Sequence, residues 1–408
     1  MVKYRKLSRL IYICLIMFFL LGIGKGYDNK SEKIFNNIKI QGIDVGGMNY
    51  NEALNEINKY YKVKPIGISY EDKKWTIYPE EISLDYNIDK SLKEAYKYTN
   101  SNDNLENLKR KIGLTFNKNY NIKLNATYNE IKLSEIIESI CKEIDVDVTQ
   151  ANFEIKGYGE IVRTPSKEGK EVDVIKLKEE IYNMINNKNI KDLNLPVKIV
   201  KPTITTEDVE SINTVLGQFS TSFNDSSSRG NNIHVAGEST SGKLIMPKDI
   251  FSYNKATGAR TWVNGYKTAK VIVGGKFVNG EGGGVCQVST TIYNAALLAG
   301  VGIEEVHNHT IQSRYVPRGR DASVSYGYTD LKLKNTFAHP IYIYNIVGNG
   351  SITSRIYGCK DDRQKLYIKT EEKHEKDSIL VKTYRIYLDE ENNKIIEELI
   401  ATSKYKIK

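Results

Sequence analysis

The chain has 408 residues, a formal net charge of +9 at pH 7 and four cysteines. Its basic residues are spread along the chain and no basic-aromatic motif accompanies them, so we exclude nucleic acid from the expected partners. A basic protein of this kind is attracted instead to polyanionic surfaces. Four cysteines in so long a chain indicate no disulfide framework.

The first nine residues include four basic ones, and an apolar or small run follows from 10 to 24. These fifteen residues are short for a membrane-spanning helix, which needs roughly seventeen or more, but the layout is typical of a secretory signal. No small-residue cleavage site follows. We therefore expect an uncleaved anchor over 1–26 with the rest of the chain outside the cell; a released form is the alternative. Cys14 lies in this run and is interpreted as a packing residue.

The region from 35 to 200 alternates helical and strand-like patterns, which predicts two small α+β repeats at 35–120 and 121–200. The first has a helical pattern at 50–60 and strand-like stretches at 66–70 and 75–78. The second has helical patterns at 133–144 and 174–185 and strand-like stretches at 151–155 and 161–164. Cys141 is interpreted as structural, and a bridge from it to Cys359 is left open.

A glycine-rich turn then leads into a cysteine, in the segment Gly280–Gly300. From Val285 onward the apolar residues recur with the helical period, and Gly300 is placed to end the helix in a left-handed conformation. A thiol in the first turn of a helix lies near unpaired N–H groups and the positive end of the helix dipole, which favours the thiolate. The glycines let the backbone approach a substrate closely. This pattern predicts a nucleophile at Cys286.

Two other interpretations of this segment remain open. A single cysteine is often a small buried hydrophobe with no chemical role. A glycine run before a helix can also hold a phosphate, but no Lys-Ser/Thr pair follows, which disfavours a P-loop.

Two histidines, His307 and His309, follow the cysteine about twenty residues later. An imidazole is the usual base for a cysteine nucleophile. Their alternation predicts a strand with both rings on one face, where one addresses the thiol and the other binds substrate or packs. A zinc site built from Cys286, His307 and His309 is the alternative, but it lacks an evident fourth ligand. We expect neither a metal nor a cofactor.

Arg320 and Asp321 are adjacent further along the chain. The arginine is suited to hold a substrate carboxylate and the aspartate to orient an imidazole. A surface ion pair between the two is the alternative.

After Asp330, alternating patterns predict strands at 340–347, 351–357 and 378–388, with a turn at 348–350 and a last hairpin arm around 395–400. We therefore expect an α+β fold in which the cysteine-bearing helix packs on an antiparallel sheet. The expected domain spans 210–360, and a strand or hairpin extension spans 361–408.

These motifs resemble the VanW domain family, over about 216–358 of the chain. The matching segments are Phe219–Phe223, Pro247–Asn254, Thr257–Thr261, Gly265–Ala269, Gly282–Thr290, His307–His309, Tyr315–Pro317, Gly319–Ala322 and Asp330–Asn335. Residues 165–173 resemble a peptidoglycan-binding module that often precedes such domains. Family members often carry arginine where this chain has Val306, so a carboxylate-binding role would fall to Arg314, Arg318 or Arg320.

The resemblance implies a cell-wall L,D-transpeptidase. The thiolate of Cys286 would attack the carbonyl of the third residue of a peptidoglycan stem and expel the terminal D-alanine. An amine of a neighbouring stem would then take the acyl group, joining two diaminopimelate residues. His309 or His307 would do the acid and base chemistry, with His309 preferred. We assign oxyanion stabilisation and substrate binding to Gly283, Gly284, Gln287, Ser289, Tyr315 and Arg320, and imidazole orientation to Asp321.

Two further functions are kept as alternatives. One is a peptidoglycan endopeptidase or carboxypeptidase, in which water resolves the same acyl-enzyme. The other is a wall-binding accessory protein in which Cys286 is structural. The expected partners are peptidoglycan stem peptides and, through the N-terminal helix, the membrane, with the protein facing the cell wall. The oligomeric state is open.

Overall fold

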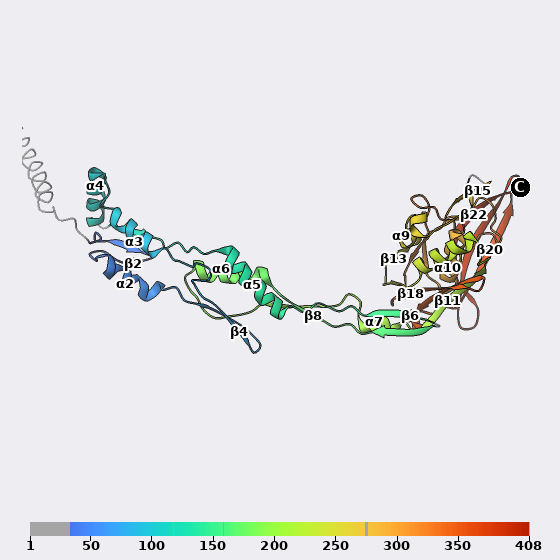
Figure 1. The fold of residues 1–408 in the computed structure, drawn as a ribbon, viewed down its shortest axis with the longest axis horizontal. Coiled ribbons are helices and arrows are strands. Elements are labelled where there is room, and N and C mark those ends of the chain that lie inside the picture. Colours follow the sequence, from blue (N-terminus) through green and yellow to red (C-terminus); the bar gives the residue numbers. More distant parts are fainter. Residues whose placement is uncertain (1–32, 117, 158, 274–275, 408) are drawn as a thin grey trace, which may run out of the picture. The chain divides into compact units, whose positions relative to one another are not determined.

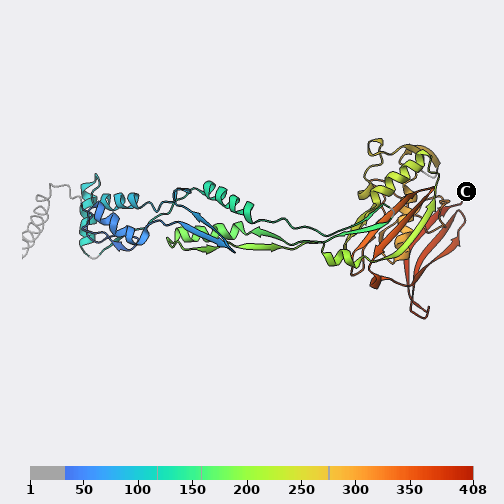
Figure 2. The ribbon, with the colours of Figure 1, turned by 60° about the horizontal axis from the view of Figure 1, so that its bottom comes forward.

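The computed structural model describes residues 33–407 except 117, 158, 274 and 275, and Figures 1 and 2 show its course. The anchor expected over 1–26, including Cys14, lies outside the described residues. Among the described helices, none is long and apolar enough to cross a membrane. The chain divides into two compact units: one runs to 147 and includes 170–200, and the other comprises 148–169 and 201 onward.

The first unit consists of short helices packed on small sheets. Its elements are β1 (Ile38–Ile40), β2 (Ile43–Asp44), α2 (Tyr50–Tyr61), β3 (Ile66–Tyr70), β4 (Lys73–Ile77), α3 (Ile88–Lys97), α4 (Asn104–Thr115), β5 (Tyr120–Ile122), α5 (Glu130–Ile144), β8 (Gly169–Val172), α6 (Val174–Asn186), β9 (Leu193–Asn194) and β10 (Val197–Val200). Asparagine side chains cap two amphipathic helices of this unit: Asn49 forms a capping box with Glu52 before α2, and Asn129 caps α5.

One hydrophobic core of this unit combines residues that lie far apart in the chain. Strand β3 pairs in parallel with β9, placing Ile68 opposite Leu193. Ile68 therefore packs with Ile137 of α5 and Ile181 of α6. The strands expected in the repeat 35–120 thus share a core with helices of 121–200, because sequence alternation indicates a strand without indicating which helix covers it.

The second unit is larger. Its elements are β6 (Asn152–Lys156), β7 (Glu160–Thr164), α7 (Thr206–Ser211), β11 (Thr214–Ser222), α8 (Ser228–Thr240), β12 (Lys243–Ile245), β13 (Ile250–Ser252), α9 (Tyr253–Thr257), η1 (Trp262–Asn264), β14 (Thr268–Val273), β15 (Lys276–Glu281), α10 (Val285–Ala299), β16 (Gly302–Glu305), β17 (Lys332–Lys334), β18 (Ile341–Gly348), β19 (Ser351–Gly358), η2 (Lys360–Asp362), β20 (Leu366–His374), β21 (Ser378–Leu388) and β22 (Lys394–Lys406).

The hairpin of β6 and β7 belongs to this second unit, although the sequence places it within 121–200. The ring of Phe153 meets that of Tyr342 edge-on at 4.8 Å between centroids. Arg163 donates hydrogen bonds to the carbonyls of Val209 and Ile212, at 3.0 and 2.6 Å. These contacts join residues far apart in the chain, which explains why local patterning assigns the hairpin differently.

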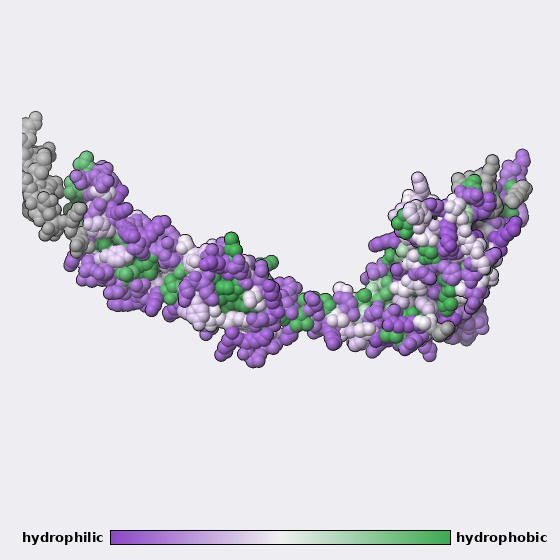
Figure 3. All heavy atoms as spheres, viewed as in Figure 1, coloured by the Kyte–Doolittle hydropathy of each residue, from purple (hydrophilic) through white to green (hydrophobic). Residues whose placement is uncertain are grey.

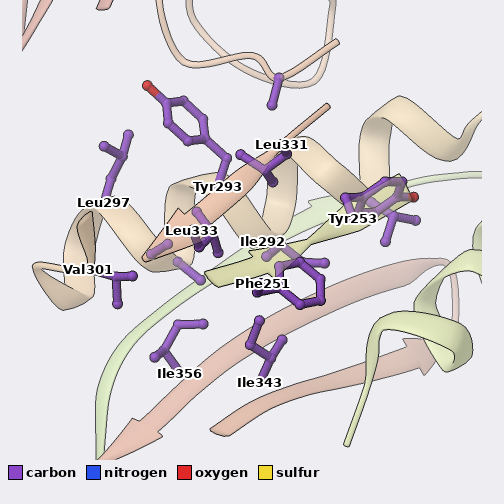
Figure 4. Packing of buried hydrophobic residues seen from close by; sticks show 14 of the residues in the cluster. Phe251, Tyr253, Ile292, Tyr293, Leu297, Val301, Leu331, Leu333, Ile343 and Ile356 are labelled. Carbon is purple, nitrogen blue, oxygen red and sulfur yellow. The ribbon is translucent and has the colours of Figure 1, made fainter. Parts of the chain in front are cut away.

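Helix α10 packs on the antiparallel sheet β11-β19-β18-β12. Figure 4 shows Ile292 of the helix in the layer above Ile343 and Ile356 of the sheet. Gly217 of β11 allows this close packing, because a Cβ there would lie 2.5 Å from the backbone nitrogen of Ala299. The predicted helix, its end at Gly300 and the strands around the 348–350 turn are confirmed.

The three-stranded sheet β20-β21-β22 completes the unit. Arg385 of β21 is 1% exposed and donates a hydrogen bond to the carbonyl of Val301 at 2.8 Å, directly after α10.

Cys141 and Cys359 are both free thiols, so the bridge between them that the sequence left open is not formed. The described surface in Figure 3 is mostly hydrophilic, with scattered apolar residues.

Candidate active site

The turn between β15 and α10 places Cys286 as the second residue of the helix. Gly284 precedes the helix with φ of +111°, a conformation that strongly favours glycine, and a Cβ there would lie 2.8 Å from Cγ of Arg229. At Gly283 a Cβ would lie 2.6 Å from the carbonyl oxygen of Lys270. Asn232 fixes the turn by donating a hydrogen bond to the carbonyl of Gly283 at 2.9 Å. The glycines are therefore needed to bring the thiol to this position.

The thiol of Cys286 lies against an extended segment that includes Val324. Its Sγ atom is 3.5 Å from both the backbone nitrogen and the carbonyl oxygen of Val324. The imidazole of His309 also interacts with it, and the guanidinium of Arg260 acts on it through its charge. The structure thus brings together the cysteine and the histidine preferred from the sequence.

His309 is held from its far side by a buried carboxylate. Its Nδ1 lies 2.6 Å from Oδ2 of Asp321, and its backbone N–H donates to the same oxygen at 2.7 Å. The Asp321 side chain is 1% exposed and that of His309 is 10% exposed. A carboxylate on Nδ1 fixes the tautomer that leaves Nε2 free to exchange a proton with the thiol. Cys286, His309 and Asp321 therefore have the arrangement of a catalytic triad.

A fourth residue, Tyr405 of β22, extends this chain of hydrogen bonds. Its hydroxyl donates to Oδ1 of Asp321 and accepts the backbone N–H of Gly319 at 2.7 Å. Burial, followed by the nearby Asp321 charge, raises the pKa of Tyr405 and keeps the hydroxyl a donor. Both oxygens of Asp321 are thus occupied, which fixes the plane of the carboxylate.

The electrostatics favour a charged pair between the thiol and the imidazole. Burial opposes ionisation of Cys286, but the interaction with His309 outweighs it, so the pKa of the thiol is lowered. Burial likewise opposes the charged imidazole, but Asp321 and then Cys286 raise the pKa of His309 to about 10. The two shifts agree in direction. Both shifts favour the thiolate and the imidazolium over the neutral pair, and the thiolate is the form in which a cysteine is a nucleophile.

Cys286 opens into a cavity of about 1310 Å³. The glycine turn forms part of its wall. The other lining residues come from β11, α8, β14, the start of α10, Arg260 and the segments 309–315 and 323–326. They are Ser220–Ser222, Arg229, Arg260, Lys270, Val271, Glu281–Gln287, His309, Ile311–Tyr315 and Ser323–Tyr326. A peptide substrate therefore has room beside the thiol.

Four of the residues assigned from the sequence to substrate or oxyanion binding line this cavity: Gly283, Gly284, Gln287 and Tyr315. Gln287 is 1% exposed; its Nε2 donates to Thr221 and to the carbonyl of Ser222, both at 2.9 Å. Burial, then the neighbouring Cys286, raises the pKa of Tyr315. This tyrosine is therefore a neutral hydroxyl at the cavity wall.

Three other predicted residues lie outside the cavity lining. The strand expected to carry both histidines ends at Glu305, and the half-exposed His307 pairs with that glutamate at 3.0 Å. Ser289 is buried and donates to the carbonyl of Ala322 at 2.7 Å. Arg320 donates from Nε to Asn294 at 2.6 Å. The rings of His307 and His309 do not share a face, because the backbone leaves the strand before reaching them.

The zinc alternative finds no support in this arrangement. His307 turns to Glu305, and no group of three or more potential metal ligands is found among the residues that the structure describes.

Sequence reasoning missed Arg229, Arg260 and Tyr405. Arg260 falls within the Thr257–Thr261 motif, so a signal was present, although its chemical role was not assigned. Tyr405 is 84 positions from Asp321 and Arg229 is 58 positions from its partner Gln287. No local pattern connects residues at such separations.

Comparisons with known proteins identify two family matches, and the site lies in the region of the first. The family model described as "VanW like protein" matches residues 228–357, and the model described as "Putative peptidoglycan binding domain" matches 75–194. "Uncharacterized protein YoaR" of Bacillus subtilis (strain 168) is 34% identical over 220 residues, covering 53% of this chain and 72% of that protein. "Vancomycin B-type resistance protein VanW" of Enterococcus faecalis (strain ATCC 700802 / V583) is 26% identical over 141 residues, 33% of this chain and 51% of that protein. No solved structure matches the chain.

Proposed function

The chain belongs to the VanW family, and from that premise we propose that it is a cell-wall L,D-transpeptidase with Cys286 as its nucleophile. The observation that carries the proposal is the thiol paired with His309, whose Nδ1 is held by the buried Asp321 at 2.6 Å. An accessory protein with a structural cysteine would not need an imidazole oriented in this way.

The proposed reaction begins with attack of the Cys286 thiolate on the carbonyl carbon of the third stem residue. A carbon–sulfur bond forms, the bond to the terminal D-alanine breaks, and the imidazolium of His309 gives its proton to the leaving amine. The backbone N–H groups of Gly284 and Cys286 are suited to stabilise the oxyanion, whereas those of Val285 and Gln287 donate to Gly282 and Gly284. An amine of a second stem then attacks the thioester, His309 takes its proton, and the thiolate is regenerated.

The peptidoglycan-binding domain found at 75–194 supports the choice of substrate. A domain that binds the polymer raises the local concentration of stem peptides around the cavity. The proposal includes a position at the outer face of the membrane, with residues 1–26 as anchor and the described units facing the cell wall.

The decisive experiment incubates the purified full chain and its Cys286→Ala variant with disaccharide-tetrapeptide, and identifies the products by mass spectrometry. Loss of D-alanine together with a diaminopimelate-to-diaminopimelate dimer, both dependent on Cys286, is the expected result. D-alanine loss that yields only tripeptide would identify a carboxypeptidase instead. Equal turnover by the two proteins would remove Cys286 from the mechanism.

A further inference from the structure

The walls of the cavity carry an excess of positive charge beside the thiol. Arg229, Arg260, Lys270 and Arg314 line it, whereas Glu281 is the one carboxylate among the described lining residues. A cavity with four cations and a single carboxylate selects an anionic ligand.

Arg260 has hydrogen-bonding capacity that the described residues leave unused. Its Nη2 donates to Oδ1 of Asn254 at 2.5 Å, and its guanidinium lies 5.6 Å from the centroids of both the Tyr253 and Tyr326 rings. Its Nε and Nη1 are buried, and neither finds an acceptor in the part of the chain that the structure describes. Leaving such donors buried and unpaired is unfavourable, whereas each of them can donate a charge-assisted hydrogen bond to a carboxylate oxygen.

Arg229 also lies against the glycine turn. Its Nη2 donates to Oε1 of Gln287 at 2.7 Å, which fixes the guanidinium over the start of α10. Both arginines pack against glycines of this turn: a Cβ on Gly282 would lie 2.6 Å from Cβ of Arg260, and one on Gly284 would lie 2.8 Å from Cγ of Arg229. Both arginines therefore flank the turn that ends in Cys286.

From this placement we infer that Arg260, with Arg229 beside it, binds the free carboxylate of the residue that leaves. The inference rests on the proposed function and deepens it. If a carboxylate lies next to the thiol, the scissile bond is the last peptide bond of the donor stem. At an internal peptide bond, the residue after the scissile bond would carry an uncharged amide in place of that carboxylate. The site then accepts a stem that ends at the leaving D-alanine and rejects one extended beyond it or amidated there.

The departing residue leaves with its carboxylate on Arg260 and its new amine protonated by His309. The acyl group stays on Cys286. Release of the zwitterionic amino acid empties the carboxylate subsite. The subsite therefore acts in acylation and has no part in the attack of the acceptor amine.

The test compares tetrapeptides that end in D-alanine as the free acid or as the carboxamide. The full chain and its Arg260→Gln variant are given both substrates, and Cys286-dependent release of D-alanine or its amide is measured. We expect kcat/KM of the wild type to be about 10- to 100-fold lower for the carboxamide, the range of a charge-assisted hydrogen bond. Arg260→Gln should lower kcat/KM for the acid by a similar factor and should have little effect on kcat/KM for the carboxamide. Arg363→Gln, an exposed arginine outside the cavity lining, is the matched control and should change neither.

A binding measurement separates this inference from the proposed function. Calorimetry with the Cys286→Ala chain should give tighter binding of the acid than of the carboxamide, and Arg260→Gln in that background should abolish the difference. If the wild type shows no turnover but the difference in binding persists, the transpeptidase proposal fails and the carboxylate subsite stands. Equal binding of acid and carboxamide, or an equal loss on both in Arg260→Gln, would overturn the inference.

Discussion

The hydroxyl of Tyr405 donates a hydrogen bond to Oδ1 of Asp321, while Oδ2 of the same carboxylate holds Nδ1 of His309 at 2.6 Å. Tyr405, in the last strand β22, therefore reaches His309 through one buried side chain. The C-terminal sheet thus contributes to the candidate active site, although the sequence indicated only a strand or hairpin extension at 361–408.

Replacing Tyr405 by phenylalanine should slow acylation by leaving Oδ1 of Asp321 without its donor. We expect kcat to fall roughly tenfold, with KM little changed, because the carboxylate and then the imidazole lose their fixed orientation. The rate of Cys286 alkylation by iodoacetamide at pH 7 should fall in parallel, and circular dichroism should confirm the fold. Tyr367→Phe in the exposed part of β20 is the control. Unchanged turnover and alkylation would show that Tyr405 only supports the fold.

Asp321→Asn should be far more damaging than Tyr405→Phe. An amide in place of the carboxylate no longer stabilises the imidazolium or enforces the tautomer with Nε2 free for the thiol. In triads of this kind the loss in kcat is on the order of 10³–10⁴. Steady-state kinetics check this, with Asp361→Asn, an exposed position in η2, as the control. A loss confined to KM would contradict an orienting role.

The reactivity of Cys286 should depend on pH in a way that identifies its partner. Because His309 lowers the pKa of the thiol, alkylation should already be fast below the ordinary cysteine pKa of about 8.5. In His309→Ala the burial of the thiol remains without the compensating imidazolium, so its pKa should rise and alkylation at pH 7 should fall at least roughly tenfold.

Cys141 supplies an internal control for that experiment. Burial, then the charge of Asp145, raises its pKa, so it should react slowly at pH 7 in both proteins. Peptide mapping by mass spectrometry distinguishes the two thiols. Equal alkylation of Cys286 with and without His309 would refute the charged pair.

The charged pair also predicts an alkaline limit for turnover. His309 must be protonated to donate to the leaving amine, and its pKa is raised to about 10. The proton is therefore present through the neutral range and is lost as the pH rises through about 10. We expect acylation to decline above that pH, and Asp321→Asn to move the decline toward the ordinary histidine value of about 6.5. A limit near neutral pH in the wild type would contradict the pairing.

Gly217→Ala tests how the cysteine helix is held on the sheet. A Cβ at this position would lie 2.5 Å from the nitrogen of Ala299 and 2.6 Å from the carbonyl oxygen of Ala295, both backbone atoms that cannot move aside. Such overpacking typically destabilises by about 1–3 kcal/mol. Thermal unfolding should show a lower midpoint. Gly113→Ala in α4, where the nearest atom is 3.6 Å away, should leave the midpoint unchanged or raise it, and an equal effect of both changes would argue against the close helix–sheet contact.

The local chemistry of the nucleophile was available from the sequence. The helical period after Val285, the glycines before it and Gly300 after it are all local signals, because helix start, period and termination depend on neighbouring residues. The strands of 340–357 and the turn between them were readable for the same reason. The residue types also indicated His309 as a base and Asp321 as the acid that orients it.

Tertiary structure decided which candidates meet. His307 and His309 are two residues apart, yet only His309 reaches both Cys286 and Asp321, because the strand ends at Glu305 and the backbone turns. Arg314, Arg318 and Arg320 were the expected carboxylate ligands; Arg314 lines the cavity, but Arg320 donates to Asn294 instead. Arg229 and Arg260, which were not expected, lie against the glycine turn before the thiol. Spacing in the sequence determined which residues were present and what local structure they form. Their distances in space, and hence the triad, the Tyr405 contact and the charge of the cavity, were set by packing between segments that no short-range pattern connects.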